Sequence, residues 1–279
     1  MGSPLSGKPL GGANKRRTLA LSPVYASNVP VHLHWSIMCC LLHAPMESAM
    51  HTLALVWVAF ILGLMPLQAI LSRRKVQNLR PTRMRAYAST ISGLTLMGAV
   101  TLGVDWFSGG TGIHAAGLLL PSRILSIWTL ITLLCCATVW LAGMLQRKLW
   151  QQPADEVVTL LLPRTTRERW VFAAVSILAG MVEEYVMRGF CLLVLAQATG
   201  SMPLSLTLVT VGFAVAHGYQ GVAATVRTGV LGAILAVPVV VTGTLIPSMV
   251  AHAGTDLLAG ALGFRLLRRW NLLHEEKSR

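Results

Sequence analysis

The chain has 279 residues, of which 54% are hydrophobic and only 12% are charged, and its mean hydropathy is +0.64. A soluble domain carries roughly 25% charged residues, so this composition excludes an ordinary water-soluble protein and predicts an all-α polytopic membrane protein. The net charge of +13 does not indicate nucleic-acid binding, because the basic residues gather in short polar stretches between apolar runs.

Residues 1–34 are rich in Gly, Pro, Ser and basic residues and show no apolar periodicity, and the apolar stretch 35–45 that follows is too short to span a membrane. Residues 1–45 are therefore predicted to form a disordered N-terminal extension. No apolar segment in them resembles the core of a signal peptide. Because Met46 opens the first long apolar run and would make a natural start, our hypothesis is that the preceding residues are absent from the mature protein.

Residues 46–150 are expected to contain three N-terminal transmembrane helices. The corresponding apolar runs cover 51–71, 86–107 and 124–145, and each is close to the roughly 20 residues that a bilayer requires. The stretch 151–169 that follows is amphipathic in its middle and is flanked by tryptophans, which predicts a cytoplasmic linker lying along the membrane interface.

Residues 170–266 are expected to form the functional membrane core, and 267–279 a cytoplasmic tail. The apolar segments of the core are 170–187, 189–198, 204–217, 221–242 and 245–264. With the first three spans, this makes about eight helical segments. Several are too short for a full crossing, so some are expected to be short or re-entrant and to surround a polar cavity.

The basic residues predict the orientation of the chain in the membrane. Six of them lie in 72–85, and more lie in 146–169 and in the C-terminal tail. Short loops rich in Lys and Arg are typical of the cytoplasmic side. We therefore expect a multi-pass membrane protein with a cytoplasmic C-terminus. The general style of the sequence suggests a bacterial host, and hence the plasma membrane.

The stretch "EEYVMRGF" places two carboxylates, Glu183 and Glu184, at the end of an apolar helix. Glu184 and Arg188 are four residues apart, so they share a helix face and can form an ion pair. Glu183 points about 100° away and is left free to act as a general base or acid. The alternative is a purely structural role, in which both carboxylates pair with Arg188 to hold helices together. However, ionisable residues within a membrane are usually functional.

Two histidine motifs follow in the same half of the chain. "FAVAH" ends at His217, and "HAGTD" places His252 and Asp256 on one helix face. Each motif alone could be structural, as a satisfied core histidine or a local His–carboxylate hydrogen bond. Two histidines with carboxylates are also the ligand set of a hydrolytic zinc ion, and the same residues could activate water directly.

The clustering of these groups favours one site. Glu183, Glu184 and Asp256 are the carboxylates found in apolar context, and they occur in the same part of the chain as His217 and His252. None of these groups lies in the first three spans. A single polar pocket in the C-terminal half explains this distribution better than scattered packing roles.

These motifs resemble those of the CAAX-protease and bacteriocin-processing (CPBP) family of membrane proteins, which includes the type II CAAX prenyl proteases. "EEYVMRGF" matches the EExxxR signature of the family and "FAVAH" matches its FxxxH motif. "HAGTD" stands where the family has HxxxN or a variant, so Asp256 replaces the usual Asn. The resemblance covers roughly residues 167–269.

The resemblance implies an intramembrane endopeptidase whose site opens toward the cytoplasm. It implies that Glu183 is the catalytic base, that His217 orients the water or binds a metal, and that His252 and Asp256 bind a metal or stabilise the oxyanion. Glu184, Arg188 and Phe213 would be supporting residues. An ionised Asp cannot donate a hydrogen bond, so Asp256 favours a zinc ion held by His217, His252 and Asp256.

Other functions remain open at this stage. The same pocket could bind a peptide without cleaving it, as in an immunity-type partner protein. A proton- or ion-coupled transporter would also place carboxylates and histidines in the bilayer, but it usually shows an inverted repeat, and the sequence shows no internal repeat. The expected partners are the lipid bilayer and a membrane-associated protein or peptide.

Overall fold

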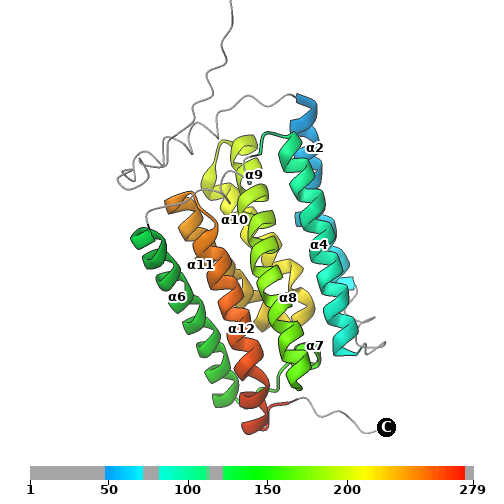
Figure 1. The fold of residues 1–279 in the computed structure, drawn as a ribbon, viewed down its shortest axis with the longest axis vertical. Helices are drawn as coiled ribbons and strands as arrows, with labels where there is room; N and C mark the ends of the chain where they lie inside the picture. The colour runs from blue at the N-terminus through cyan, green and yellow to red at the C-terminus, as the bar shows by residue number, and fades with distance from the viewer. Residues whose placement is uncertain (1–47, 72–81, 111, 113–121, 274–279) are drawn as a thin grey trace, which may run out of the picture.

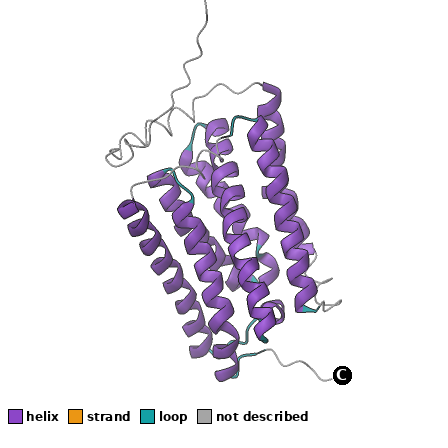
Figure 2. Ribbon diagram, viewed as in Figure 1, coloured by secondary structure: helices purple, strands orange, loops and turns teal. Residues whose placement is uncertain are grey.

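The computed structural model describes residues 48–71, 82–110, 112 and 122–273 (Figure 1). In these ranges every regular element is a helix and there is no strand (Figure 2). The all-α fold expected from the composition is therefore confirmed. The predicted N-terminal extension, most of the basic stretch 72–85 and the last six residues of the tail lie outside the described residues.

The helices follow the order of the apolar runs. Their bounds are α2 Ser48–Ala59, η2 Phe60–Leu64, α4 Arg83–Phe107, α6 Ser122–Leu149, α7 Glu156–Leu161, α8 Thr166–Glu184, η3 Tyr185–Cys191, α9 Leu192–Thr199, α10 Met202–Ala216, η4 Gly218–Gln220, α11 Val222–Thr242 and α12 Ile246–Arg269. Among the described residues, five helical stretches are long and apolar enough to cross a membrane: Ala49–Leu71, Arg83–Phe107, Arg123–Leu149, Thr166–Thr199 and Val222–Thr242. The chain is thus an integral membrane protein.

The long helices pack as a bundle with α12 near its centre. In Figure 1, α6, α12, α8 and α4 stand side by side in this order, and α12 contacts both α6 and α8. Behind this layer, α11 packs against α6, α10 and α12. This arrangement brings the ends of α8 and α10 and the first half of α12 together, although they are far apart in the sequence.

The piece 189–198 differs from its expected form. It is neither a separate short helix nor re-entrant, because α8, η3 and α9 form one continuous helical stretch from Thr166 to Thr199. Residues Tyr185–Cys191 are a π-helical turn, a feature that inserts an extra residue into a helix and is frequent at functional sites. Gly189 therefore does not end the helix.

The stretch 151–169 contains a short helix that packs against the bundle. Asp155 caps α7, and its side chain accepts a hydrogen bond from the Val157 amide at 3.0 Å. Tyr87 of α4 donates to the carbonyl of Leu161 at 2.6 Å. α8 then begins at a capping box between Thr165 and Glu168.

The predicted tail also begins inside the bundle. α12 continues to Arg269, and Leu272 beyond it is buried. The carbonyl of Leu272 accepts a hydrogen bond from the amide of Ala154 at 2.9 Å. The first residues of 267–279 are therefore packed against the segment before α7.

A glycine sets the close approach of α8 and α12. A Cβ atom on Gly180 would lie 2.8 Å from the backbone nitrogen of Ala253 and 2.9 Å from the carbonyl oxygen of Met249. Only glycine fits there without moving a helix. The close contact lies one turn before Glu184 on α8 and directly beside His252 on α12.

Candidate active site

The site is built on a fully buried ion pair. Arg188 Nη1 donates to Glu184 Oε1 at 3.0 Å, and the two side chains are 1% and 0% exposed. The Arg188 guanidinium also donates to the carbonyl of Gly232 at 3.0 Å and lies 4.4 Å from the ring centroid of Phe213. The ion pair expected from the spacing of Glu184 and Arg188 is present, and it links α8, η3, α10 and α11.

Glu184 also orients a histidine from another helix. The Nδ1 atom of His252 lies 2.8 Å from Glu184 Oε1, across 68 residues of sequence. Because a carboxylate accepts, Nδ1 carries the proton of this hydrogen bond. The Nε2 atom of His252 therefore faces away from Glu184.

Two further carboxylates face that nitrogen. His252 Nε2 lies 3.9 Å from Glu183 Oε2 and 3.8 Å from Asp256 Oδ2. Both separations are longer than a hydrogen bond. Glu183 Oε2 is buried and has no hydrogen-bond partner among the described residues. A buried carboxylate oxygen without a partner, beside a histidine nitrogen, is a position where a water molecule could be held.

His217 is fixed by the helix that carries it. Its Nδ1 lies 2.9 Å from the carbonyl oxygen of Phe213, so Nδ1 donates and Nε2 keeps a lone pair. The rings of Phe213 and His217 are 4.7 Å apart, and Phe213 also meets the His252 ring edge-on at 6.2 Å. Phe213 thus lies between Arg188 and both histidines.

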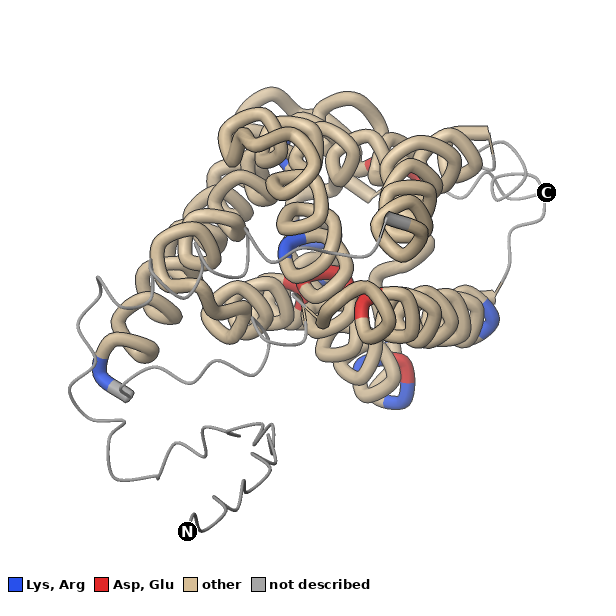
Figure 3. The backbone as a smooth tube through the Cα atoms, turned by 90° about the horizontal axis from the view of Figure 1, so that it is seen from above, with Lys and Arg blue, Asp and Glu red and all other residues tan. Residues whose placement is uncertain are grey.

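These groups meet at one cavity of about 310 Å³. Glu183, Phe213, His217, His252 and Asp256 all line it. Glu184 and Arg188 do not line it and lie behind the residues that do. Seen from above in Figure 3, acidic and basic positions occur together near the middle of the bundle, while most of the surrounding tube carries no charged residue.

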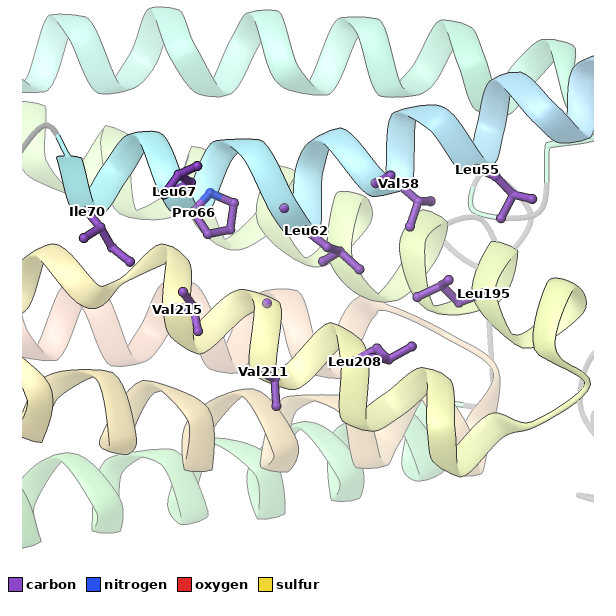
Figure 4. A pocket seen from close by; sticks show the side chains of 13 residues that line it. Leu55, Val58, Leu62, Pro66, Leu67, Ile70, Leu195, Leu208, Val211 and Val215 are labelled. Atoms are coloured by element: carbon purple, nitrogen blue, oxygen red, sulfur yellow. The ribbon is translucent and has the colours of Figure 1, made fainter.

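A second hollow lies elsewhere and is wholly apolar. It has a volume of about 450 Å³ and runs between the α2–η2 stretch and the helices α9 and α10 (Figure 4). Its walls include Leu62, Leu195 and Val211. No titratable side chain lines it, so the chemistry belongs to the first cavity.

Some residues of the site were not singled out from the sequence. Tyr219 and Gln220 line the same cavity, and the Tyr219 ring stacks on His217 with 6.1 Å between centroids. Gln220 Nε2 donates to the Tyr219 hydroxyl at 3.0 Å. Burial raises the pKa of Tyr219, and the charges of Glu183 and Asp256 add to the rise, so the phenol remains a neutral donor. The only sequence signal was their place directly after "FAVAH".

Asp105, close to the end of α4, was also not singled out from the sequence. It is 1% exposed. It accepts a hydrogen bond from the Tyr185 hydroxyl at 2.7 Å, and the Gly112 amide lies 3.3 Å away. This network joins α4 to the start of the π turn and does not reach the cavity.

The zinc site expected from the sequence requires that its donor side chains be grouped around one point. In the described part of the chain, no three His, Cys, Asp or Glu side chains are grouped so that they could hold a metal ion. His217, His252 and Asp256 share the cavity but do not form such a group. Zinc therefore stays a prediction.

Comparison with known proteins identifies the segment that carries the site. Residues 165–258, about a third of the chain, match the family described as Type II CAAX prenyl endopeptidase Rce1-like. A search of curated proteins and a search of solved structures found no match. The family expected from the three motifs is thus the one that this segment matches.

Proposed function

From this Rce1-like segment, we propose that the protein is an intramembrane endopeptidase that hydrolyses peptide bonds of membrane-associated proteins or peptides. The observation that supports this most is Glu183 Oε2, a buried oxygen without a hydrogen-bond partner among the described residues, 3.9 Å from His252 Nε2 at the wall of the cavity. A binding pocket for a peptide has no need for such a group.

In the proposed reaction, Glu183 is the general base. It takes a proton from a water molecule, and the water oxygen attacks the carbonyl carbon of the scissile bond. The lone pair on His217 Nε2 orients this water. When the tetrahedral intermediate collapses, the carbon–nitrogen bond breaks and Glu183 returns the proton to the leaving amine.

His252 is the proposed donor to the oxyanion. The carboxylates of Glu183, Glu184 and Asp256 surround it, and opposite charges favour a protonated imidazole. With Nδ1 donating to Glu184, the second proton is on Nε2 and points toward the cavity. Asp256, which cannot itself donate when ionised, contributes through the charge that it places beside His252.

A comparison of protein termini tests the proposal. Membranes from cells that make the parent protein, Glu183→Gln or Glu156→Gln at equal levels are compared by mass spectrometry. Glu156 is a matched control because it does not line the cavity. We expect new termini with the parent and with Glu156→Gln, and a loss of at least about 100-fold with Glu183→Gln, as for removal of a general base.

Matching profiles from all three folded proteins would contradict the protease and favour a peptide-binding or immunity-type protein. Uptake of a solute into proteoliposomes that depends on Glu183 would instead favour a transporter. The termini found with the parent would also identify the substrate.

Zinc needs a separate test. The reaction proposed for Glu183, His217 and His252 needs no metal, so it predicts that the purified protein retains its activity after treatment with a strong chelator. Stoichiometric zinc, together with activity that is lost on chelation and restored by zinc, would reinstate the metal-assisted reaction with His217, His252 and Asp256 as ligands.

A further inference from the structure

A buried hydrogen bond outside the cavity meets the helical stretch that contains Glu183 and Glu184. Asp105, near the end of α4, accepts from the hydroxyl of Tyr185, the first residue of the π turn, at 2.7 Å. We propose that Asp105 and Tyr185 are positioning residues, which fix the start of the π turn and thereby the direction in which both glutamates point. The inference rests on the proposed function, because Glu183 is the proposed base and Glu184 orients His252.

Asp105 stands where a carboxylate is costly. It is 1% exposed and lies in the membrane-spanning helix Arg83–Phe107, two residues before that helix ends. Burial disfavours a charge, and the negative end of the helix dipole disfavours an anion at this place. Ionisable residues at membrane depth usually mark a functional position. Because Asp105 does not line the cavity, its role must lie in the groups that it contacts.

The residues after α4 close over the same carboxylate and reach the π turn. The Gly112 amide donates to Asp105 Oδ1 at 3.3 Å, and the Gly110 amide donates to the Asp105 carbonyl at 2.7 Å. A Cβ atom on Gly112 would be 2.9 Å from the carbonyl carbon and oxygen of Gly189, which belongs to the π turn. The end of α4 therefore contacts the π turn at two places, its first residue and Gly189.

The π turn depends on such contacts for its position along the helix. Its hydrogen bonds reach one residue further than those of an α-helix, since the amide of Leu192 donates to the carbonyl of Met187, five residues before it. Single π turns are rare in proteins and are often found at functional sites. No proline or change in composition marks a place for it within 166–199. Packing at Tyr185 and Gly189 is therefore what fixes it.

A shift of the π turn would rotate the two glutamates. An extra residue placed before Glu183 instead of after Glu184 rotates both side chains by about 100° relative to the earlier part of α8. That earlier part is held against α12 at Gly180. The 2.8 Å contact between Glu184 and His252 would then break, and Glu183 would turn away from the cavity. The hydrogen bond at Tyr185, directly after Glu184, prevents this shift.

Removal of one hydroxyl group tests the inference. Tyr185→Phe deletes the hydrogen bond to Asp105 and keeps the ring. Thr101→Val is the matched control, because it removes a fully buried hydroxyl of the same helix that accepts from Trp57 of α2 at 2.9 Å. Both proteins are compared with the parent in detergent by amide hydrogen exchange, read by mass spectrometry, and by their unfolding temperatures.

Local opening of the π turn is the expected result. Loss of a hydrogen bond to a charged group predicts that the amides of 185–191 exchange about tenfold faster or more in Tyr185→Phe. Thr101→Val should show no increase confined to these amides. If Tyr185→Phe does not fold, Asp105→Asn is measured in the same way. It retains an acceptor for the hydroxyl and is expected to show a smaller increase in the same amides.

Kinetic constants connect the π turn to catalysis. With a peptide that spans a cleavage site found by the comparison of termini, Tyr185→Phe is expected to lower kcat about 10- to 100-fold, as for a small displacement of a catalytic group. KM should stay within a few-fold, because neither Asp105 nor Tyr185 lines the cavity. Asp105→Asn should add little to the loss in kcat caused by Tyr185→Phe, because both changes act on one hydrogen bond. Fully additive losses would overturn the inference.

This inference and the protease can fail separately. Faster exchange at 185–191 with unchanged kcat would reject the positioning role and leave the protease in place. Unchanged exchange in Tyr185→Phe would reject the positioning role whatever the value of kcat. A parent protein that cleaves nothing would reject the protease, and the exchange of these amides would then decide by itself whether Asp105 and Tyr185 fix the π turn.

Discussion

Glu183 and Glu184 are neighbours in the sequence but have different surroundings. Glu184 is 0% exposed, and its Oε1 atom accepts from both Arg188 and His252. Glu183 is 21% exposed and lines the cavity. The rotation of about 100° between adjacent helical residues is sufficient to place one carboxylate in the packed interior and the other beside the reacting groups.

This difference predicts that the two substitutions have different effects: Glu184→Gln lowers the stability of the protein, and Glu183→Gln lowers its activity. Glu184→Gln leaves the Arg188 cation buried without an anionic partner, which is expected to cost ~3 kcal/mol of unfolding free energy, and it also releases His252. Glu183→Gln removes activity with little effect on stability. Thermal unfolding in detergent, followed beside peptide cleavage, checks this. Equal loss of stability in both variants would contradict the assignment.

At the scale of the helices, the contact between α8 and α12 determines the geometry of the site. Ser248 of α12 donates to the carbonyl of Leu235 on α11 at 2.6 Å, so α12 is also tied to its other neighbour. The close approach at Gly180 brings His252 within 2.8 Å of Glu184. A small separation of these helices would break that hydrogen bond before it unfolded the bundle.

We therefore expect Gly180→Ala to lower activity more than its effect on stability would suggest. The added methyl group meets backbone atoms at 2.8 Å, and such overpacking costs about 1–3 kcal/mol. Gly93→Ala on α4 is the matched control, because a Cβ atom there meets nothing within 4 Å. Unfolding temperature and cleavage rate are measured for both. Full activity in Gly180→Ala would show that the close contact is not required.

The sequence predicted the helices well because span length depends on local composition. It also predicted the Glu184–Arg188 pair, because a spacing of four residues places side chains on one helix face. The continuity of 166–199 was missed, because a π turn leaves no break in composition. Gly189 therefore suggested an end that the backbone does not have.

Contacts between helices were less predictable. The sequence did predict that four residues lie together, because they cluster in one half of the chain: Glu183, His217, His252 and Asp256. The hydrogen bond from His252 to Glu184 did not, because it depends on how α8 and α12 are rotated against each other. Arg227 was likewise missed, because its place in the cavity depends on how α11 packs against α6 at Gly143.

At the scale of the whole molecule, basic residues gather at one end of the bundle. α4 begins at this end, α6 and α12 end there, and α7 and the start of α8 lie between them (Figure 1). Contacts join these parts, including Lys148 over the ring of Trp270 at 5.3 Å and Arg164 over that of Phe264 at 5.2 Å. The basic residues of this end are Arg83, Arg85, Arg147, Lys148, Arg164, Arg167, Arg169, Arg268 and Arg269.

A basic end of this kind predicts the orientation of the protein in the membrane. Since Lys and Arg near the ends of spans favour the cytoplasm, we expect the C-terminus and the end of the cavity that Arg147 lines to face it. A green fluorescent protein fused after Arg279 should be fluorescent, and alkaline phosphatase at the same position inactive. Fusions after Gly110, which follows the opposite end of α4, should behave in the reverse way. The opposite pattern at both positions would mean that the cavity receives substrate from the other side of the membrane.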